Sequence, residues 1–449
     1  MTSHLRIFLL TACCALACLP WRAVHVQASH PEFRATWFTT HKSIDWPRTV
    51  ITNPEDTLLQ QQEMIDIFDA LKAGNMNAIC FQARPVADAF YRSSYEPWSP
   101  NLTGVRGQDP GYDPLAFAIL QAHQRGMELH AWVNPFRYEF YAGERVTDIE
   151  AFMASEDSDP IGIEHPDWLL RYTNGHFKGT IIDPGNPTAR AYVIKVVMEI
   201  VRNYDVDGLV MDDYFYPYGG TVDEDFRSQL SYQPDYLTVE DWRRQNVNTT
   251  IRTLHDSIKA AKPWVKFGMS PFGIYSLIPE AAAHYGLKLP EGITGTDAWA
   301  VLYCDPLAWV EGGYVDYLSP QLYWSTKSTR QNFETLCRWW SESVMAIDAR
   351  RGDGKHTRVY VSHADYRFGA EELGLQIDIN RRYAPYGEPG SIFYNTNQYL
   401  LFTEGKAPER TCEILSQTHF ANPVMVDTVS ADWLGSRFRR MTLRQQQNK

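Results

Sequence analysis

Between Asp205 and Pro217 the chain reads Asp-Val-Asp-Gly-Leu-Val-Met-Asp-Asp-Tyr-Phe-Tyr-Pro. Its short apolar run, Gly208–Met211, is typical of a strand buried in a parallel sheet. In barrels of alternating strands and helices, the carboxyl ends of the strands carry the chemistry. Asp212 and Asp213 are therefore candidate catalytic acids. The alternative, helix capping and packing, would need their buried charge to be compensated.

Similar apolar runs alternate with helical patterns along most of the chain. Such alternation implies a parallel sheet, and eight repeats fit a closed (β/α)8 TIM barrel. A doubly wound open sheet is the alternative, but no glycine-rich phosphate loop follows the first strand. The expected strands are Phe33–Thr39, Asn77–Ala83, Glu128–Asn134, Gly208–Met211, Lys266–Pro271, one within Tyr314–Trp324, Thr357–Ala364 and Ser391–Asn395, and the expected helices are Thr57–Lys72, Pro114–Arg125, Pro187–Tyr204, Val239–Ala261 and Asn332–Arg350.

Two segments interrupt this alternation. The longer one, Phe136–Gly185, follows the third strand and is too long for a plain loop, so we expect a lid or a substrate-binding subdomain over the barrel mouth. The other is acidic and runs from Tyr214 to Thr238. The predicted organisation is an export signal over residues 1–28, a barrel over residues 32–400 and a short appendage with a tail over residues 401–449.

The N-terminus has the pattern of an export signal. Arg6 precedes an apolar stretch, Ile7–Pro20, and Val26–Ala28 offers a small-residue cleavage site. Leu10–Cys13 matches the lipoprotein acylation pattern but follows an unusually short apolar region, whereas Ala15–Cys18 has a better length and a poorer first residue. Soluble export and a lipid anchor therefore both remain open. We expect an exported protein, periplasmic or anchored in the cell envelope, that contacts the membrane only through such an anchor. No later segment of the sequence reaches the length of a membrane span.

Composition excludes some classes of function. The net charge of −12 argues against nucleic-acid binding, which needs a basic face. The 14 Trp and 25 Tyr are typical of carbohydrate clefts, although such rings also pack in cores. No metal-ligand spacing or Gly-x-Ser-x-Gly elbow is present, so we expect neither a metal nor a cofactor. Cys80 reads as a buried thiol, and a disulfide among Cys304, Cys337 and Cys412 remains open.

Polar and aromatic side chains gather at the carboxyl ends of the predicted strands. A closed barrel brings such strand ends to one mouth. A glycosidase needs one carboxyl group to protonate the leaving oxygen and a second group to offset the charge at the anomeric carbon. Amides and arginines hold sugar substituents, and aromatic rings stack on the sugar. The candidate substrate-binding residues are Trp37, Gln82, Arg84, Asn134, Arg137, Tyr214, Gln321, Tyr323, Trp324, His363, Asp365 and Asn395.

Five of these candidates have a structural alternative. His363 is also compatible with a hydrogen-bonded core histidine. Arg84 and Arg137 would also serve simply as structural partners of the acids. Trp37 and Trp324 would also serve as packing in the barrel wall.

Strand geometry separates the two acids. Successive strand residues point to opposite faces, so Asp212 shares a face with Val210 and Tyr214, whereas Asp213 points the other way. We interpret Asp212 as the directly catalytic carboxylate and Asp213 as a group that orients or ionises its surroundings. Apolar walls and a like-charged neighbour are expected to raise the pKa of the acid that stays protonated.

A series of short motifs lies in order between residues 32 and 400: Arg34–Trp37, Asp45–Pro47, Gln82–Pro85, Glu96–Ser99, Leu102–Gly104, Tyr112–Leu115, His130–Pro135, Asp183–Asn186, Asp207–Pro217, Asp241–Asn248, Ser270–Gly273 and Asp316–Trp324. The series resembles the bacterial glycosyl hydrolase-like family ten, whose members include an exported, division-associated peptidoglycan glycan hydrolase. The resemblance implies a TIM-barrel hydrolase of the cell envelope. It would act on strands of alternating N-acetylglucosamine and N-acetylmuramic acid, and the resemblance leaves open whether it acts only where stem peptides have been removed.

The stretch Asp207–Tyr214 is also similar to the acidic strand of family-eighteen chitinases. The chain departs from that motif at Tyr214, where the motif has its catalytic Glu, so that acid assignment does not transfer. Acetamido-assisted chemistry stays open, and so do retention and inversion, because sequence does not give the separation of the carboxylates. Hydrolysis of another polysaccharide and a non-catalytic glycan-binding barrel are the remaining alternatives. The sequence does not give the oligomeric state.

Overall fold

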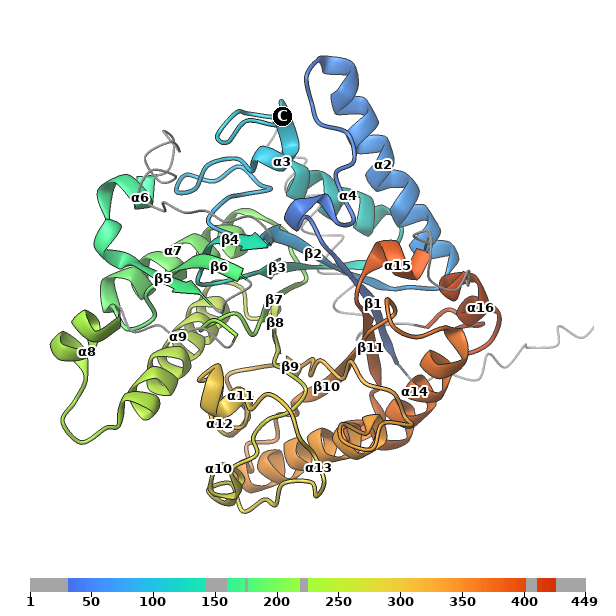
Figure 1. Cartoon of the computed structure of the whole chain (residues 1–449). Coiled ribbons are helices and arrows are strands. Elements are labelled where there is room, and N and C mark those ends of the chain that lie inside the picture. Colours follow the sequence, from blue (N-terminus) through green and yellow to red (C-terminus); the bar gives the residue numbers. More distant parts are fainter. Residues whose placement is uncertain (1–30, 143–159, 174–176, 219–224, 401–409, 425–449) are drawn as a thin grey trace, which may run out of the picture. The chain divides into compact units, whose positions relative to one another are not determined.

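The computed structural model describes residues 31–142, 160–173, 177–218, 225–400 and 410–424. A closed barrel of eight parallel strands forms its centre, in the order β1-β11-β10-β9-β8-β7-β3-β2 (Figure 1). Because β1 pairs with β11 as well as with β2, the sheet has no open edge. The predicted (β/α)8 barrel is confirmed, and the open-sheet alternative is wrong.

The eight predicted strands are all present, and apolar residues cover both of their faces because helices pack outside and side chains fill the inside. Alternate residues such as Ala35, Cys80 and Val210 fill the barrel interior. The sixth strand is the shortest. The strands are β1 (Phe33–Phe38), β2 (Ala78–Arg84), β3 (Glu128–Val133), β7 (Gly208–Asp212), β8 (Lys266–Ser270), β9 (Tyr317–Leu318), β10 (Arg358–His363) and β11 (Gly390–Phe393).

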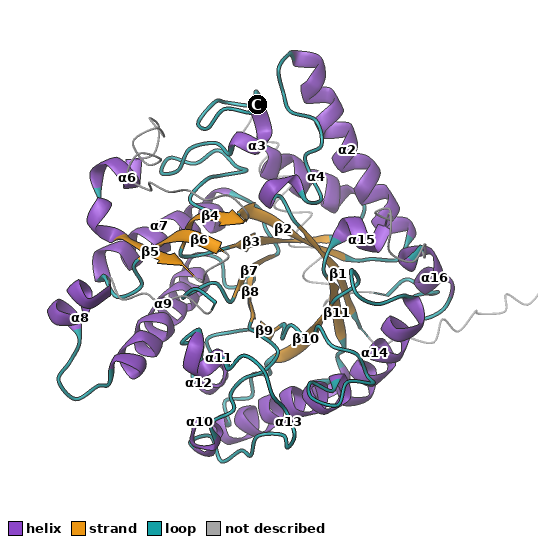
Figure 2. Cartoon of the chain, in the orientation of Figure 1, coloured by secondary structure: helices purple, strands orange, loops and turns teal. Residues whose placement is uncertain are grey.

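Helices surround the ring of strands (Figure 2). The five predicted helices form, and their ends follow local caps. For example, α2 begins at Pro54 because Asn53 and Asp56 form a reciprocal capping box. No helix of the described residues is long and apolar enough to cross a membrane. The helices are α2 (Pro54–Ala73), α3 (Pro100–Thr103), α4 (Pro114–Gln124), α6 (Pro160–Glu164), α7 (Pro187–Asn203), α8 (Phe226–Tyr232), α9 (Val239–Ala261), α10 (Pro279–Ala283), α11 (Ala298–Val301), α12 (Pro306–Glu311), α13 (Phe333–Arg351), α14 (Ala370–Tyr383), α15 (Thr396–Leu400) and α16 (Thr411–Gln417).

The long insertion after β3 contains a sheet of its own. Its strands β4 (Arg137–Ala142), β6 (Phe177–Ile182) and β5 (Leu169–Thr173) are antiparallel, in the order β4-β6-β5 (Figure 2). Because β4 starts at the carboxyl end of β3, the sheet begins at the barrel mouth. Residues 143–159 and 174–176 of the insertion lie outside the described residues, so its action as a lid stays a prediction.

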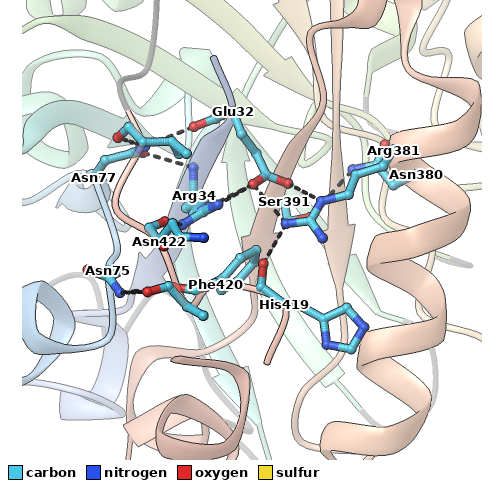
Figure 3. A network of polar contacts seen from close by, with 12 residues as sticks. Glu32, Arg34, Asn75, Asn77, Asn380, Arg381, Ser391, His419, Phe420 and Asn422 are labelled. Carbon is cyan, nitrogen blue, oxygen red and sulfur yellow. Dashed lines mark hydrogen bonds and ion pairs between the residues drawn. The ribbon is translucent and has the colours of Figure 1, made fainter. Parts of the chain in front are cut away.

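The C-terminal segment 410–424 packs against the amino-terminal end of the barrel (Figure 3). Arg34, at the start of β1, donates a hydrogen bond of 2.8 Å to the carbonyl oxygen of Asn422. The Phe420 ring lies under Arg34 and Arg381, whose guanidinium carbons are 4.4 and 5.8 Å from its centroid. Both arginines also pair with Glu32. This part of the predicted appendage therefore covers the barrel end opposite the mouth.

Two other expectations concern cysteines and export. Cys80, Cys304, Cys337 and Cys412 are buried and none forms a disulfide, so the disulfide left open by the sequence does not form. The predicted export signal, residues 1–28, lies outside the described residues.

Candidate active site

A cavity of about 420 Å³ opens at the carboxyl ends of the barrel strands. Its walls come from the ends of β1, β2, β3, β7 and β8, from the start of β4, and from the loops that follow β1, β7, β9, β10 and β11. This is the end of the barrel at which such enzymes carry out chemistry. The predicted side chains that line it are Trp37, Gln82, Arg137, Asp212, Tyr214, Gln321 and Tyr323.

Asp212 ends β7, and its side chain faces the cavity. Val210, two residues earlier on the same face, belongs to the cluster that fills the barrel interior. One carboxyl oxygen of Asp212 accepts a hydrogen bond of 3.1 Å from the Trp132 indole nitrogen, and the other accepts one of 3.4 Å from the Tyr214 backbone N–H. The carboxyl group is thus fixed in orientation while it lines the cavity.

The surroundings of Asp212 keep a proton on it near neutral pH. Its pKa is raised to about 7, chiefly by burial and also by the charge of Asp213, although the Arg137 guanidinium and the Trp132 hydrogen bond act to lower it. A carboxyl group with a pKa close to the working pH serves well as a general acid, since it carries a proton and gives it up readily. Asp212 therefore has the electrostatics of a proton donor.

Arg137 holds its position through a ring. Its guanidinium carbon lies 3.7 Å from the centroid of the Tyr214 ring, and both residues line the cavity. Such a cation–π contact fixes the arginine beside Asp212. Arg137 can then stabilise the Asp212 carboxylate that remains after a proton has been transferred.

Asp213 does not line the cavity. The Tyr218 hydroxyl donates a hydrogen bond to its Oδ2. Burial raises the pKa of Asp213 to about 6, against the lowering effect of hydrogen bonds from Tyr218, from backbone and from Gln321. Asp213 is thus a buried charge directly behind Asp212, in agreement with the alternation of strand residues.

Two predicted ligands are structural residues instead. Arg84 is fully buried and makes an ion pair of 2.5 Å with Glu96 and hydrogen bonds to the backbone oxygens of Asn134 and Pro135. It therefore fastens two loops together behind the cavity wall. His363 contacts Gln376 at 3.0 Å and Ser391 at 3.1 Å, on the side of β10 that faces α14. Burial lowers its pKa to about 4, so it is a neutral core histidine.

Asn134 and Trp324 also lie outside the cavity lining. Asn134 is buried, and its side-chain oxygen accepts a hydrogen bond of 3.3 Å from Gln82, so it supports a lining residue. The Trp324 ring packs edge-on against Phe272, with centroids 5.6 Å apart, in the layer between barrel and helices. Trp324 is wall packing, and Tyr323 is the residue of this pair that faces the cavity.

Asp365 and Asn395 do not line the cavity, but each is next in sequence to a residue that does. Both are buried, and their neighbours Tyr366 and Tyr394 line the cavity instead. Strand ends turn within a residue or two, so the face that meets the cavity shifts there relative to the pattern of the strand. Asp365 instead lies near Asp45, whose charge raises its pKa in addition to the larger effect of burial.

Several lining residues escaped sequence reasoning as ligands. His41, Lys42 and Ile44 come from the loop after β1, and the only signal for them was their position just past a strand end. Trp132 lies two residues before Asn134 and so shares a face of the strand with it, which was the signal for Trp132 in the sequence. The remaining lining residues without a predicted role are Thr39, Ser270, Tyr366 and Tyr394.

Aromatic rings form much of the wall. Trp37 and Trp132 meet edge to face with centroids 4.9 Å apart, and Tyr323 stacks with Tyr394 at 6.0 Å. The faces of such rings are suited to stack on the apolar faces of sugars, and the amide side chains of Gln82 and Gln321 line the same cavity. In the part of the chain that the structure describes, no group of three His, Cys, Asp or Glu side chains is placed to hold a metal ion.

The family model described as glycosyl hydrolase-like 10 matches residues 32–363. Glycosyl hydrolase YngK of Bacillus subtilis is 37% identical over 367 residues, which cover 79% of this chain and 66% of YngK. Glycosyl hydrolase DigH of Escherichia coli is 33% identical over 374 residues, which cover 79% of this chain and 81% of DigH.

Among solved structures, the α-L-fucosidase isoenzyme 2 of Paenibacillus thiaminolyticus superposes with a TM-score of 0.50 at 15% identity, over 87% of this chain and 49% of the fucosidase. At that identity the likeness bears on the fold alone, and it agrees with the barrel. The family match and the two relatives carry the assignment. The chain belongs to the glycosyl hydrolase-like 10 family and is a glycoside hydrolase.

Proposed function

We propose that this protein is an exported hydrolase that cleaves glycosidic bonds in N-acetylated glycan strands, with peptidoglycan as its substrate. The observation that carries the catalytic part is Asp212, a buried carboxyl group with a pKa of about 7 that faces an aromatic-lined cavity. A pure glycan-binding barrel needs rings and amides but no acid whose proton affinity is raised in this way.

In this proposal Asp212 donates its proton to the oxygen of the leaving sugar as the bond between that oxygen and the anomeric carbon breaks. Water supplies the hydroxyl group that the anomeric carbon gains and the proton that returns Asp212 to its starting form. The resulting carboxylate keeps its hydrogen bonds from Trp132 and from the Tyr214 backbone, and it gains the attraction of Arg137. The anion is therefore stabilised where it forms, without movement of the side chain. Preorganised donors of this kind lower the activation barrier because they need no rearrangement during the reaction.

Asp213 acts through its neighbour. Its negative charge raises the pKa of Asp212, and Tyr218 holds its carboxyl group in place. When Asp213 is ionised, it opposes the loss of a proton from Asp212 and so keeps the acid in its working form. Asp213 is a positioning residue in this scheme, because its side chain does not line the cavity.

Support for the substrate and for export comes from the sequence. The motif series resembles a family whose members include a peptidoglycan glycan hydrolase, and the N-terminus has the pattern of a secretory signal. Gln321 lines the cavity with an amide group suited to acetamido and hydroxyl substituents, and the rings suit pyranose faces. N-terminal sequencing of the mature protein should therefore find Ser29, or an acylated Cys13 or Cys18, as the first residue. Intact Met1 on a cytoplasmic protein would contradict export.

The substrate is tested with purified protein and four glycans: intact sacculi, sacculi freed of stem peptides by an amidase, chitin, and a neutral polysaccharide. Released reducing ends and mass spectrometry of the fragments identify the bond that is cut. We expect cleavage of the N-acetylated strands and none of the neutral polymer. Cleavage of the neutral polymer alone would show a different polysaccharide as substrate, and binding of every glycan without cleavage would show a non-catalytic barrel.

A further inference from the structure

Lys42 reaches the rim of the cavity from a loop with strained backbone. The loop follows β1 and includes the 3-10 turn η1 (His41–Ser43). Lys42 has φ 52° and Ser43 has φ 53°, in the left-handed region that residues with a side chain rarely adopt. Two such residues in succession persist only where the surrounding structure holds them, and strain of this kind is concentrated at functional sites.

Neighbouring side chains hold this loop in place. The Gln82 side-chain oxygen accepts hydrogen bonds from the backbone N–H groups of Thr40 at 3.0 Å and His41 at 2.9 Å. The Thr40 hydroxyl donates to the Gln82 backbone oxygen at 2.8 Å, and Asn101 donates to the Thr40 carbonyl oxygen at 3.0 Å. The backbone that carries Lys42 is thus held at the rim before any substrate arrives, so the loop itself needs no ordering on binding.

The cavity rim carries positive charge, although the net charge of the protein is negative. The chain has a net charge of −12, yet Lys42, Arg137 and His41 all line the cavity. Among the described residues that line it, Asp212 is the one acid. Burial and the charges of Arg137 and Lys42 lower the pKa of His41 to about 3, so this imidazole is neutral. Arg137 is buried against Tyr214 and beside Asp212, whereas Lys42 is exposed.

We propose that Lys42 binds a carboxylate of the glycan close to the bond that Asp212 cleaves, and that the preferred substrate is therefore an acidic glycan. The inference rests on the proposed function and extends it to the charge of the substrate. The lactyl ether of N-acetylmuramic acid and the C6 carboxylate of a uronic acid both present this group. In peptidoglycan the lactyl carboxylate is anionic only where no stem peptide is attached to it.

The test compares glycans that differ in the carboxylate. Peptide-free peptidoglycan strands carry it on the lactyl group, and the same strands amidated with a carbodiimide and ammonia lose the charge at nearly constant size. Hyaluronan carries it on a uronic acid, and soluble chitin oligosaccharides lack it. Both kcat/KM and the equilibrium affinity are measured for each, because affinity reports on Lys42 even if a glycan is bound and not cut.

Three variants isolate the charge. Lys42→Met removes it and keeps the length of the side chain, Lys42→Arg keeps it, and Lys355→Met is a matched control. Lys355 is exposed in the loop before β10, at the opposite end of the barrel. We expect Lys42→Met to weaken affinity and kcat/KM for the free strands by about two- to fivefold, the effect of an exposed ion pair, with Lys42→Arg close to wild type.

Lys42→Met should leave the amidated strands and chitin unchanged, and Lys355→Met should change nothing. The carboxylated glycan on which Lys42→Met has its effect identifies the source of the carboxylate. Equal losses on free and amidated strands, or no loss on any carboxylated glycan, would overturn the proposal while leaving the hydrolase intact. Binding without cleavage by the wild type would overturn the proposed function and still decide the role of Lys42. Neither binding nor cleavage of any glycan would overturn both.

Discussion

Asp212 owes its proton affinity to burial and to Asp213, and it owes its orientation to Trp132 and the Tyr214 backbone. Each of these neighbours comes from β3 or from the end of β7, so the acid is held by rigid elements. Sites built on strands keep their geometry better than sites built on loops. The single-residue changes around it therefore have separable effects.

Tyr323 and Trp324 provide a matched pair of substitutions. We expect Tyr323→Ala to weaken glycan binding by about 1 kcal/mol, because its ring lines the cavity and stacks with Tyr394. Trp324→Ala should leave affinity unchanged and lower the free energy of unfolding by about 2–4 kcal/mol, because its ring packs outside the barrel. Binding calorimetry and urea denaturation check the pair. The reverse pattern would place Trp324, not Tyr323, in the binding wall.

Strand parity explains which site residues the sequence could predict. Asp212, Trp37 and Gln82 lie within strands, where alternate residues face alternate sides, and all three line the cavity. Asp365 and Asn395 lie just past strand ends, where the chain turns and parity no longer holds. Sequence periodicity carries no information on those turns, so the neighbouring tyrosines were missed.

At the scale of elements, the alternation of apolar runs and helical patterns was enough to predict the barrel, because each strand is buried on both faces. The small sheet β4-β6-β5 was expected only as an insertion, since its register depends on antiparallel pairing between segments far apart in sequence. The loop after β1 was not predicted as part of the site. Its conformation depends on Gln82, which belongs to another strand.

Gln82 therefore links two elements, and its replacement tests that link. Gln82→Met should leave two backbone N–H groups of the β1 loop without their acceptor, at a cost of about 1–3 kcal/mol in the free energy of unfolding. The loosened loop should also lower kcat/KM. Chemical denaturation and steady-state kinetics on a verified glycan measure both. Unchanged stability would show that the loop holds its strained conformation without Gln82.

At the scale of the whole molecule, the C-terminal segment is part of the barrel's stability. Phe420 is fully buried against Arg34 and Arg381 at the end opposite the cavity. Phe420→Ala should lower the free energy of unfolding by about 3 kcal/mol, the usual cost of truncating a buried ring. The kcat of the folded variant should be unchanged, since the cavity lies at the other end. Loss of kcat in a fully folded variant would contradict this separation.

Buried carboxyl groups also give the molecule a pH-dependent stability. Burial raises the pKa of Asp45 to about 7, despite hydrogen bonds from the backbone of Thr39 and Asn397 that lower it. An acid whose folded pKa is raised stabilises the fold fully below its unfolded pKa of 3.8, and that contribution is lost as the pH rises through 7. The pKa values of His41 and His363 are lowered to about 3 and 4. Their contribution to the free energy of unfolding therefore decreases as the pH falls below 6.5, because the unfolded chain takes up protons that the folded protein does not.

The contribution of Asp45 is isolated by comparison with Asp45→Asn. We subtract the free energy of unfolding of the variant from that of the wild type. This difference should fall as the pH rises from 4 to 7, because in that range unfolding of the wild type releases the Asp45 proton, and the variant has no such proton. Urea denaturation at half-unit steps of pH measures this difference. A difference that rises with pH would mean that Asp45 is ionised in the folded protein.

Proton donation by Asp212 to the glycosidic oxygen is tested by the kcat of Asp212→Asn on a verified glycan. We expect a folded protein that still binds the glycan, with kcat lower by about two to four orders of magnitude, the range of general acid catalysis. Asp213→Asn should lower kcat less, because the Asp213 side chain does not line the cavity. Full activity of Asp212→Asn would show that Asp212 is not the proton donor.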